Sequence, residues 1–161
     1  MVTRNADVGA CQVATAWQAL GTFGEKCVTK DCGCPRCKRS RTLVRLPANF
    51  KCADVICDFC GYLAQVKATT VESPERVPRQ VLGAAWQPQM ERMQAGIYFP
   101  LFPVLTTEQK TAYAIYYLSA DLQRPEMFKV RQPLSAAARR AGWTGFTYDL
   151  DSVRSALVRL K

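Results

Sequence analysis

The stretch from Cys34 to Lys67 reads CPRCKRSRTLVRLPANFKCADVICDFCGYLAQVK and contains two Cys-X-X-Cys pairs, CPRC and CDFC, separated by nineteen residues. Each pair can present two thiolates to one tetrahedral ion, so two pairs complete a four-sulfur site. The spacing therefore predicts a structural zinc ion. Its four expected ligands are Cys34, Cys37, Cys57 and Cys60.

Other interpretations of the cysteines remain open at this point. The chain of 161 residues has eight cysteines and no histidine, and all eight cysteines fall within the first sixty residues. A disulfide framework would normally staple the whole chain, and a redox pair or an iron–sulfur cluster is less favoured without a thioredoxin-like βαβ pattern. Cys32 competes with Cys34 as a ligand, although the pair spacing favours Cys34. Cys11, Cys27 and Cys52 are expected to be small buried or half-exposed residues.

The rest of the chain predicts helices packed on a small mixed sheet, which is an α/β fold. Helical spacing of Val13, Ala16, Trp17 and Leu20 indicates a helix near the N-terminus. Helices are expected at 7–23, 88–94 and 135–142, strands at 50–57, 61–68, 97–102, 112–118 and 127–131, a loop at 69–79, and an amphipathic C-terminal segment from 151.

The hairpin that flanks the second cysteine pair also carries a catalytic pattern. If its turn centres near residues 58 and 59, Asp54 lies opposite residues 64–66, and the period of a strand places Gln65 and Lys67 on one face. Asp-(X)10-Gln-X-Lys has the form of the PD-(D/E)XK nuclease signature, with Gln65 where an acid is usual. An alternating Gln and Lys on an amphipathic strand is also an ordinary surface pattern.

Phosphodiester hydrolysis needs a metal ion that stabilises negative charge and a water molecule made nucleophilic near phosphorus. In this pattern Asp54, the Gln65 amide oxygen and the Val66 carbonyl are candidate ligands of Mg²⁺ or Mn²⁺. Lys67 is the candidate residue that positions the attacking water and helps to deprotonate it.

The charge distribution favours a polyanionic partner. The formal net charge is +9, and residues 32–53 contain six basic residues and no acid. A positive surface attracts nucleic acid, although a solvated basic loop is the simpler explanation of such a run taken alone. The uncharged stretch 8–24 is preceded by Asp7 and interrupted by polar residues, which argues against a signal peptide, so we expect a cytoplasmic protein.

Two collinear segments carry a resemblance to a known family. The run CPRC, basic loop, ADVICDFC, four residues and QVK, together with RQPLSAAARRAGWTG at 131–145, resembles the catalytic domain of the DpnI-like restriction endonucleases. The resemblance implies a PD-(D/E)XK mixed sheet flanked by helices. It also implies a type II enzyme that cleaves double-stranded DNA at GATC-like sites with methylated adenine, in a prokaryotic or phage-encoded protein.

By the same resemblance, Trp143 is a candidate for packing against the adenine methyl group, and Arg139 and Arg140 for contacting phosphate or bases. A core tryptophan and a solvated helix face are the alternatives. Residues 1–161 are expected to form a single nuclease domain without the C-terminal winged helix of such enzymes, so a separate DNA-recognition domain is a candidate partner. Two other functions stay open: a zinc-stabilised DNA-binding module inactivated through Gln65, and a redox protein.

Overall fold

The computed structural model describes residues 8–132 and 144–161 and has a mixed α/β architecture. Parallel pairing joins β3 to β5, and the other neighbouring strands of the main sheet pair antiparallel, so the sheet is mixed as the sequence predicts. In the described part of the chain this sheet has the order β1 (Leu43–Arg45), β2 (Val55–Cys57), β3 (Leu63–Thr70), β5 (Leu101–Thr106), β6 (Tyr113–Tyr117) and β9 (Val158–Arg159).

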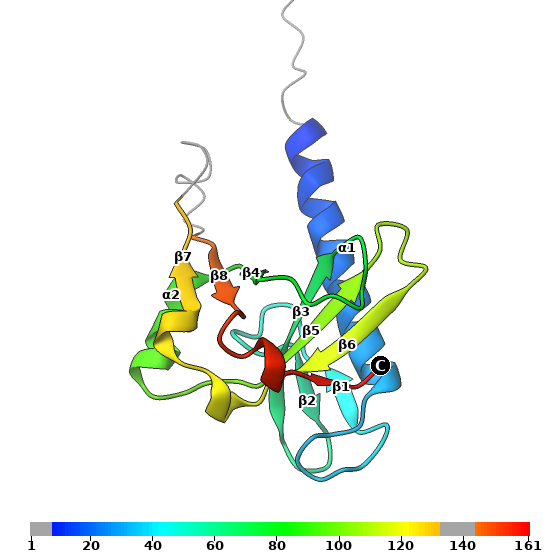
Figure 1. Cartoon of the computed structure of the whole chain (residues 1–161), viewed down its shortest axis with the longest axis vertical. Coiled ribbons are helices and arrows are strands. Elements are labelled where there is room, and N and C mark those ends of the chain that lie inside the picture. The colour runs from blue at the N-terminus through cyan, green and yellow to red at the C-terminus, as the bar shows by residue number, and fades with distance from the viewer. Residues whose placement is uncertain (1–7, 133–143) are drawn as a thin grey trace, which may run out of the picture.

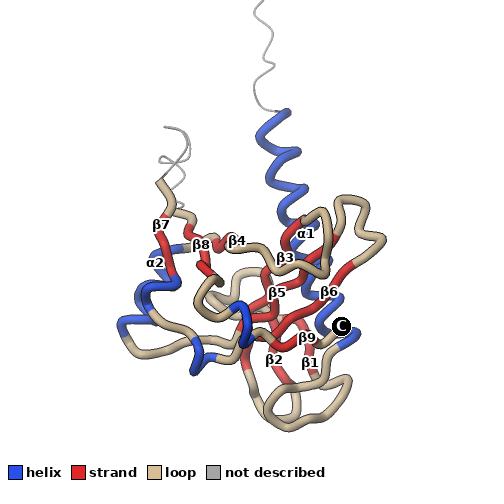
Figure 2. Tube along the Cα trace, viewed as in Figure 1, coloured by secondary structure: helices blue, strands red, loops and turns tan. Residues whose placement is uncertain are grey.

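A second, smaller sheet stands beside the main one together with a short helix (Figure 1). Its antiparallel strands have the order β4 (Gln80–Gly83), β8 (Phe146–Asp149) and β7 (Phe128–Val130), and the short helix is α2 (Trp86–Gln94). The long helix α1 (Val8–Asp31) lies against the main sheet on the other side, and loops and turns join the remaining elements (Figure 2).

Helix α1 continues through Gly21 and Gly24, beyond the end expected near residue 23. The reason is close packing on β3: a Cβ atom at Gly24 would lie 2.8 Å from the Cβ of Ala68. The glycine therefore lets helix and sheet approach, and its helical cost of about 1 kcal/mol is offset by that contact. The predicted apolar face is also corrected, because Leu20 is buried whereas Ala16 and Trp17 are exposed, and Val13 lies outside the described side chains.

Two hydrophobic clusters bury the main sheet from both sides. The first joins α1 to the cysteine-rich region and to one face of the central strands, through residues such as Val28, Val66 and Val104. The second joins the opposite side to the smaller sheet, through residues such as Leu101 and Tyr148. Because both faces of β5 are covered, all six of its residues are buried, which is typical of a central strand.

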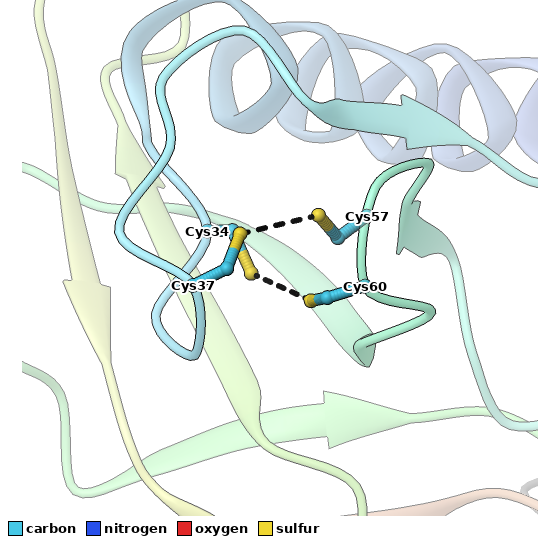
Figure 3. Close-up of side chains that lie close together, drawn as sticks. All are labelled: Cys34, Cys37, Cys57 and Cys60. Carbon is cyan, nitrogen blue, oxygen red and sulfur yellow. Dashed lines mark hydrogen bonds between the residues drawn. The ribbon is translucent and has the colours of Figure 1, made fainter.

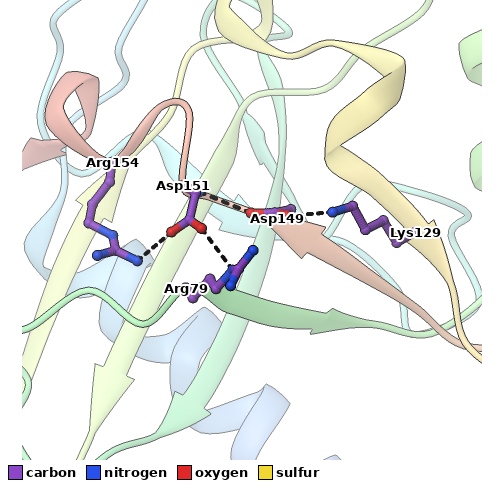
Figure 4. A network of polar contacts seen from close by, with 5 residues as sticks. All are labelled: Arg79, Lys129, Asp149, Asp151 and Arg154. Atoms are coloured by element: carbon purple, nitrogen blue, oxygen red, sulfur yellow. Dashed lines mark hydrogen bonds and ion pairs between the residues drawn. The ribbon is translucent and has the colours of Figure 1, made fainter.

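Charged residues tie together the edge of the smaller sheet (Figure 4). Lys129 on β7 donates to Asp149 on β8 at 2.6 Å, and this hydrogen bond, helped by the backbone amide of Asp151, lowers the pKa of the Asp149 carboxyl. Asp151 in turn pairs with Arg79 and Arg154, each at 2.7 Å. These contacts give both acids a structural role at the sheet edge.

The C-terminal segment is not the amphipathic helix that its sequence suggests. Val153 is buried, a short 3-10 turn follows at Arg154–Ala156, and Val158–Arg159 then pairs with β6 as strand β9. The exposed edge of β6 offers unpaired backbone groups to this segment, so strand pairing overrides the local helical pattern.

Other boundaries differ by a few residues. The expected strand 50–57 forms only over Val55–Cys57, the expected strand 97–102 is shifted to Leu101–Thr106, and strands β1, β4 and β8 were not predicted. In α2, Pro88 occupies the third helical position, whereas the first was expected. The strands expected at 112–118 and 127–131 are confirmed, and the helix expected at 135–142 lies outside the described residues. Within the described chain, no helix is long and apolar enough to cross a membrane.

Candidate functional site

The four predicted zinc ligands form one cluster (Figure 3). Their sulfur atoms all lie within 4.8 Å of one another, and the Sγ atoms of two opposed pairs are 3.6 and 3.7 Å apart. A tetrahedron with metal–sulfur bonds of about 2.3 Å has edges of about 3.8 Å, so the cluster has the dimensions of a four-thiolate metal site.

Both cysteine pairs share one turn geometry. The amide of Lys38 donates to the carbonyl of Cys34 at 2.9 Å, and the amide of Gly61 donates to that of Cys57 at 2.8 Å. In each case the residue after the second cysteine has a left-handed backbone, with φ of 62° and 72°. The same backbone conformation in both turns thus brings the four thiols close to one point.

Cys32, the competing ligand, lies outside this cluster and is buried. Burial, together with the negative charge of Asp31, raises the pKa of its thiol to about 11. The geometry of the cluster, which contains Cys34 and not Cys32, therefore decides between the two candidate ligands. Cys27 is likewise buried and Cys52 is half-buried, as expected of residues outside the metal site.

The hairpin β2–β3 brings together the three candidate catalytic residues. The amide of Asp54 donates to the Ala64 carbonyl at 2.9 Å, which continues the ladder one residue beyond β2. The Asp54 carboxylate then accepts from the Val66 amide at 2.7 Å and lies 3.8 Å from the Lys67 ammonium. The predicted pairing of Asp54 with residues 64–66 is therefore confirmed.

The main-chain geometry of Val66 places a further oxygen on this side of the strand. The Gln65 amide donates to Pro100, so the peptide groups of Gln65 face β5. Because these groups alternate in direction along a strand, the Val66 carbonyl points to the same side as its amide, toward Asp54. The backbone can thus offer a third oxygen beside the two side chains.

Asp54, Gln65 and Lys67 line a cavity of about 370 Å³. Its walls include the loop before β2 and the start of α2, and two non-glycine residues there, Cys52 and Ala85, have positive φ angles of 65° and 30°. Backbone strain of this kind is retained where the surrounding structure holds a site in place. Phe50 and Lys51 stand exposed at the cavity wall.

Gln65 differs from the sequence-based expectation in being buried. Only 4% of its surface is exposed, its amide oxygen accepts from the Tyr148 hydroxyl, and its amide nitrogen donates to the Gln89 side chain at 3.1 Å. Sequence reasoning missed both partners. The alternation of Phe146, Tyr148 and Leu150 could have marked Tyr148 as an inward-facing strand residue, whereas Gln89 lies in a polar helix without any such signal.

The basic segment, residues 32–53, precedes the hairpin and carries exposed positive charge. All six of its cations are exposed: Arg36, Lys38, Arg39, Arg41, Arg45 and Lys51. Arg45 pairs with Glu25 at 2.7 Å, and the Arg39 guanidinium lies 3.7 Å from the centre of the exposed Phe59 ring. The predicted solvent exposure of the segment is thus confirmed, and an arginine stacked on an exposed aromatic offers a flat cationic surface.

The candidate recognition residues Arg139, Arg140 and Trp143 lie outside the described residues. The structure therefore leaves their roles as predictions. Phe146, three positions after Trp143, is buried and lines the cavity, and the amide of Arg131 donates to the Gly145 carbonyl at 2.9 Å.

The fold and site define a mixed α/β protein that combines a four-cysteine metal-binding cluster with an Asp–Lys pair in a cavity. Comparison with known protein families then identifies it further: the chain belongs to the DpnI (Dam-replacing) family, whose model matches residues 5–158. This is a family of methyl-directed restriction endonucleases, and its substrate is DNA, so the predicted resemblance is confirmed. No curated protein matches the chain.

Proposed function

We propose that this protein is a metal-dependent endonuclease domain of the PD-(D/E)XK type that hydrolyses phosphodiester bonds of double-stranded DNA at adenine-methylated, GATC-like sites. The observation that carries the proposal is the convergence of Asp54, Gln65 and Lys67 on one cavity beside an exposed basic segment. Family membership supports the nuclease class and DNA as the substrate. As a restriction-type enzyme, the protein would act in the cytoplasm of a prokaryotic host.

Each site residue has a chemical role in this proposal. Asp54, the Gln65 amide oxygen and the Val66 carbonyl would hold Mg²⁺ or Mn²⁺, which prefer oxygen ligands. When bound, such an ion stabilises the negative charge that develops on the phosphate oxygens. Lys67, 3.8 Å from Asp54, would orient the attacking water, whose oxygen bonds to phosphorus as the ester bond breaks and the leaving oxygen takes up a proton.

The four-cysteine cluster has a separate role. We propose that it holds zinc, since four thiolates at tetrahedral spacing are the usual ligands of a structural zinc site. Cys57 closes β2, and Cys60 lies in the turn to β3. The ion would therefore fix the hairpin that carries Asp54 at one end and Gln65 on the partner strand.

The decisive test is digestion of matched plasmids with and without adenine methylation, with Mg²⁺ or Mn²⁺. We expect cleavage of methylated plasmid by the wild type and loss of cleavage, by at least about a hundredfold, in Asp54→Ala and Lys67→Ala, because these residues act on the metal and the water. DNA binding measured by gel shift should stay largely intact in both variants, since neither residue supplies much backbone affinity. Wild-type protein that binds methylated DNA without cutting it would instead support the DNA-binding module.

A further inference from the structure

The partners of Gln65 form a buried hydrogen-bonded chain of three side chains. Tyr148 on β8 donates to the Gln65 oxygen, and Gln65 on β3 donates through its nitrogen to Gln89 on α2 at 3.1 Å. All three side chains are buried, and each comes from a different element. Turning over the Gln65 amide alone would deprive the Tyr148 hydroxyl of its acceptor and set two amide oxygens against each other at Gln89, so the observed orientation is favoured.

The direction of this chain is set by Tyr148. A phenol carries its proton at neutral pH, and the Tyr148 hydroxyl donates it to the Gln65 amide oxygen. With Gln65 turned over, the phenol would face an amide nitrogen and lose the acceptor that it has in the structure. Tyr148 therefore selects the rotamer in which the Gln65 oxygen faces the phenol and its nitrogen faces Gln89, in the cavity that Asp54 also lines.

We propose that Tyr148 and Gln89 are positioning residues for Gln65, which keep its amide oxygen available as a metal ligand. This inference rests on the proposed function. A carbonyl oxygen has two lone pairs, so one can accept from Tyr148 while the other binds a cation. The two residues thereby fix the orientation of the amide, which decides whether oxygen or nitrogen faces the cation. A carboxylate needs no such constraint, because its two oxygens are equivalent.

The proposal predicts that the effect of Tyr148→Phe on cleavage depends on whether residue 65 is Gln or Glu. Tyr148→Phe should lower the single-turnover rate of methylated-plasmid cleavage by about 5- to 100-fold, the range expected for one buried hydrogen bond, and should weaken Mn²⁺ binding measured by calorimetry. Gln65→Glu alone should retain or increase activity, since Gln89 can rotate and donate its own amide to the carboxylate. In the Gln65→Glu background, Tyr148→Phe should then change the rate by no more than about twofold.

Two further variants keep the test decisive. Gln89→Met, which removes the acceptor of the Gln65 amide at similar volume, should likewise lower the cleavage rate and weaken Mn²⁺ binding in the wild-type background, and it replaces Tyr148→Phe there if that variant does not fold. The matched control is Tyr116→Phe, because Tyr116 is also buried and its hydroxyl donates to the Pro74 carbonyl at 3.1 Å. The control should leave the cleavage rate unchanged in both backgrounds.

Distinct outcomes separate the proposals. Equal losses from Tyr148→Phe in the wild-type and Gln65→Glu backgrounds, with a matching fall in melting temperature, would show a purely structural tyrosine and overturn the inference. An inactive Gln65→Glu variant would overturn it as well, since the amide itself would then be required. A different result would overturn the proposed function itself: equal cleavage of methylated plasmid by the wild type and by Asp54→Ala.

Discussion

At the scale of single residues, Gln65 stands where the usual nuclease signature has an acid, and in our proposal its neighbours Tyr148 and Gln89 compensate for the difference. An acid at this position would add negative charge beside Asp54, whereas an amide adds a neutral oxygen. The cation then faces one carboxylate in place of two, and the Lys67 ammonium already partly balances that carboxylate at 3.8 Å. Preference between Mg²⁺ and Mn²⁺ is therefore expected to depend on this single side chain and its two hydrogen-bond partners.

Trp143 is the residue from which we expect methyl recognition. It precedes the cavity residue Phe146 by three positions in the sequence. An adenine methyl group projects into the major groove and offers only a small apolar surface, which suits a flat indole face.

Trp143→Ala should lower the preference for methylated over unmethylated duplex, by roughly 15-fold for a site with two methyl groups at about 0.8 kcal/mol each. Fluorescence anisotropy with matched duplexes measures both affinities, and Arg139→Ala is the companion variant. Arg139→Ala should weaken binding to all sequences alike, as expected of a phosphate contact. Equal loss of binding to both duplexes in Trp143→Ala, with a lower melting temperature, would make the tryptophan a core residue.

At the scale of structural elements, the hairpin β2–β3 carries two members of the cysteine cluster together with the candidate catalytic residues. Cys57 lies three residues after Asp54, and Cys60 lies five residues before Gln65. β2 itself has only three residues and a two-residue register with β3, which is too little pairing to hold a hairpin by itself. The cysteine cluster at its tip supplies the missing constraint.

Removal of the metal should therefore unfold the hairpin. We expect one zinc per chain by elemental analysis, a lower melting temperature after chelation, and insoluble or destabilised protein for Cys60→Ser, because structural zinc contributes directly to the free energy of folding. Cys52→Ser is the matched control, since Cys52 is half-buried outside the cluster and should keep its zinc. A well-folded, active Cys60→Ser protein without zinc would show that the cluster is dispensable.

At the scale of the whole molecule, much of the net charge of +9 comes from the segment directly before the candidate catalytic hairpin. The six exposed cations of residues 32–53 precede or flank the hairpin, and Lys51 lines the cavity itself. Beside the smaller sheet, Arg79 and Arg154 both pair with Asp151, whereas in the basic segment Arg45 pairs with Glu25. The cation-rich hairpin region is therefore the expected face for DNA.

Salt dependence tests this orientation. In an Asp54→Ala background, which prevents cleavage, Arg41→Gln and Lys51→Gln should each reduce the slope of log affinity against log salt by about 1, because each removed phosphate contact releases one fewer counterion. Arg154→Gln, which removes the same charge from the 3-10 turn after the smaller sheet, should leave the slope unchanged. Identical slopes for all three variants would place the DNA on another face.

The parts of the site that lie close together along the chain could be predicted from local sequence. The spacing within each cysteine pair predicts a tight turn. The hairpin between Asp54 and Lys67 spans only fourteen residues, so the strand period and the turn position are enough to predict that its candidate catalytic residues lie together. The same holds for strand β6, whose apolar residues are continuous, and for β7, in which Phe128 and Val130 alternate with Lys129. Local chemistry was sufficient in each of these places.

The partners that come from distant elements became visible only in the folded chain. Gln89 and Tyr148 are 24 and 83 residues away from Gln65, and no local pattern links them to it. Helix α1 continues through Gly24 because β3 packs against the helix at that residue. The C-terminal segment forms a strand because the backbone groups at the edge of β6 are free to pair with it. In each case a long-range contact outweighs a local preference of about 1 kcal/mol or less per residue, which the sequence alone cannot reveal.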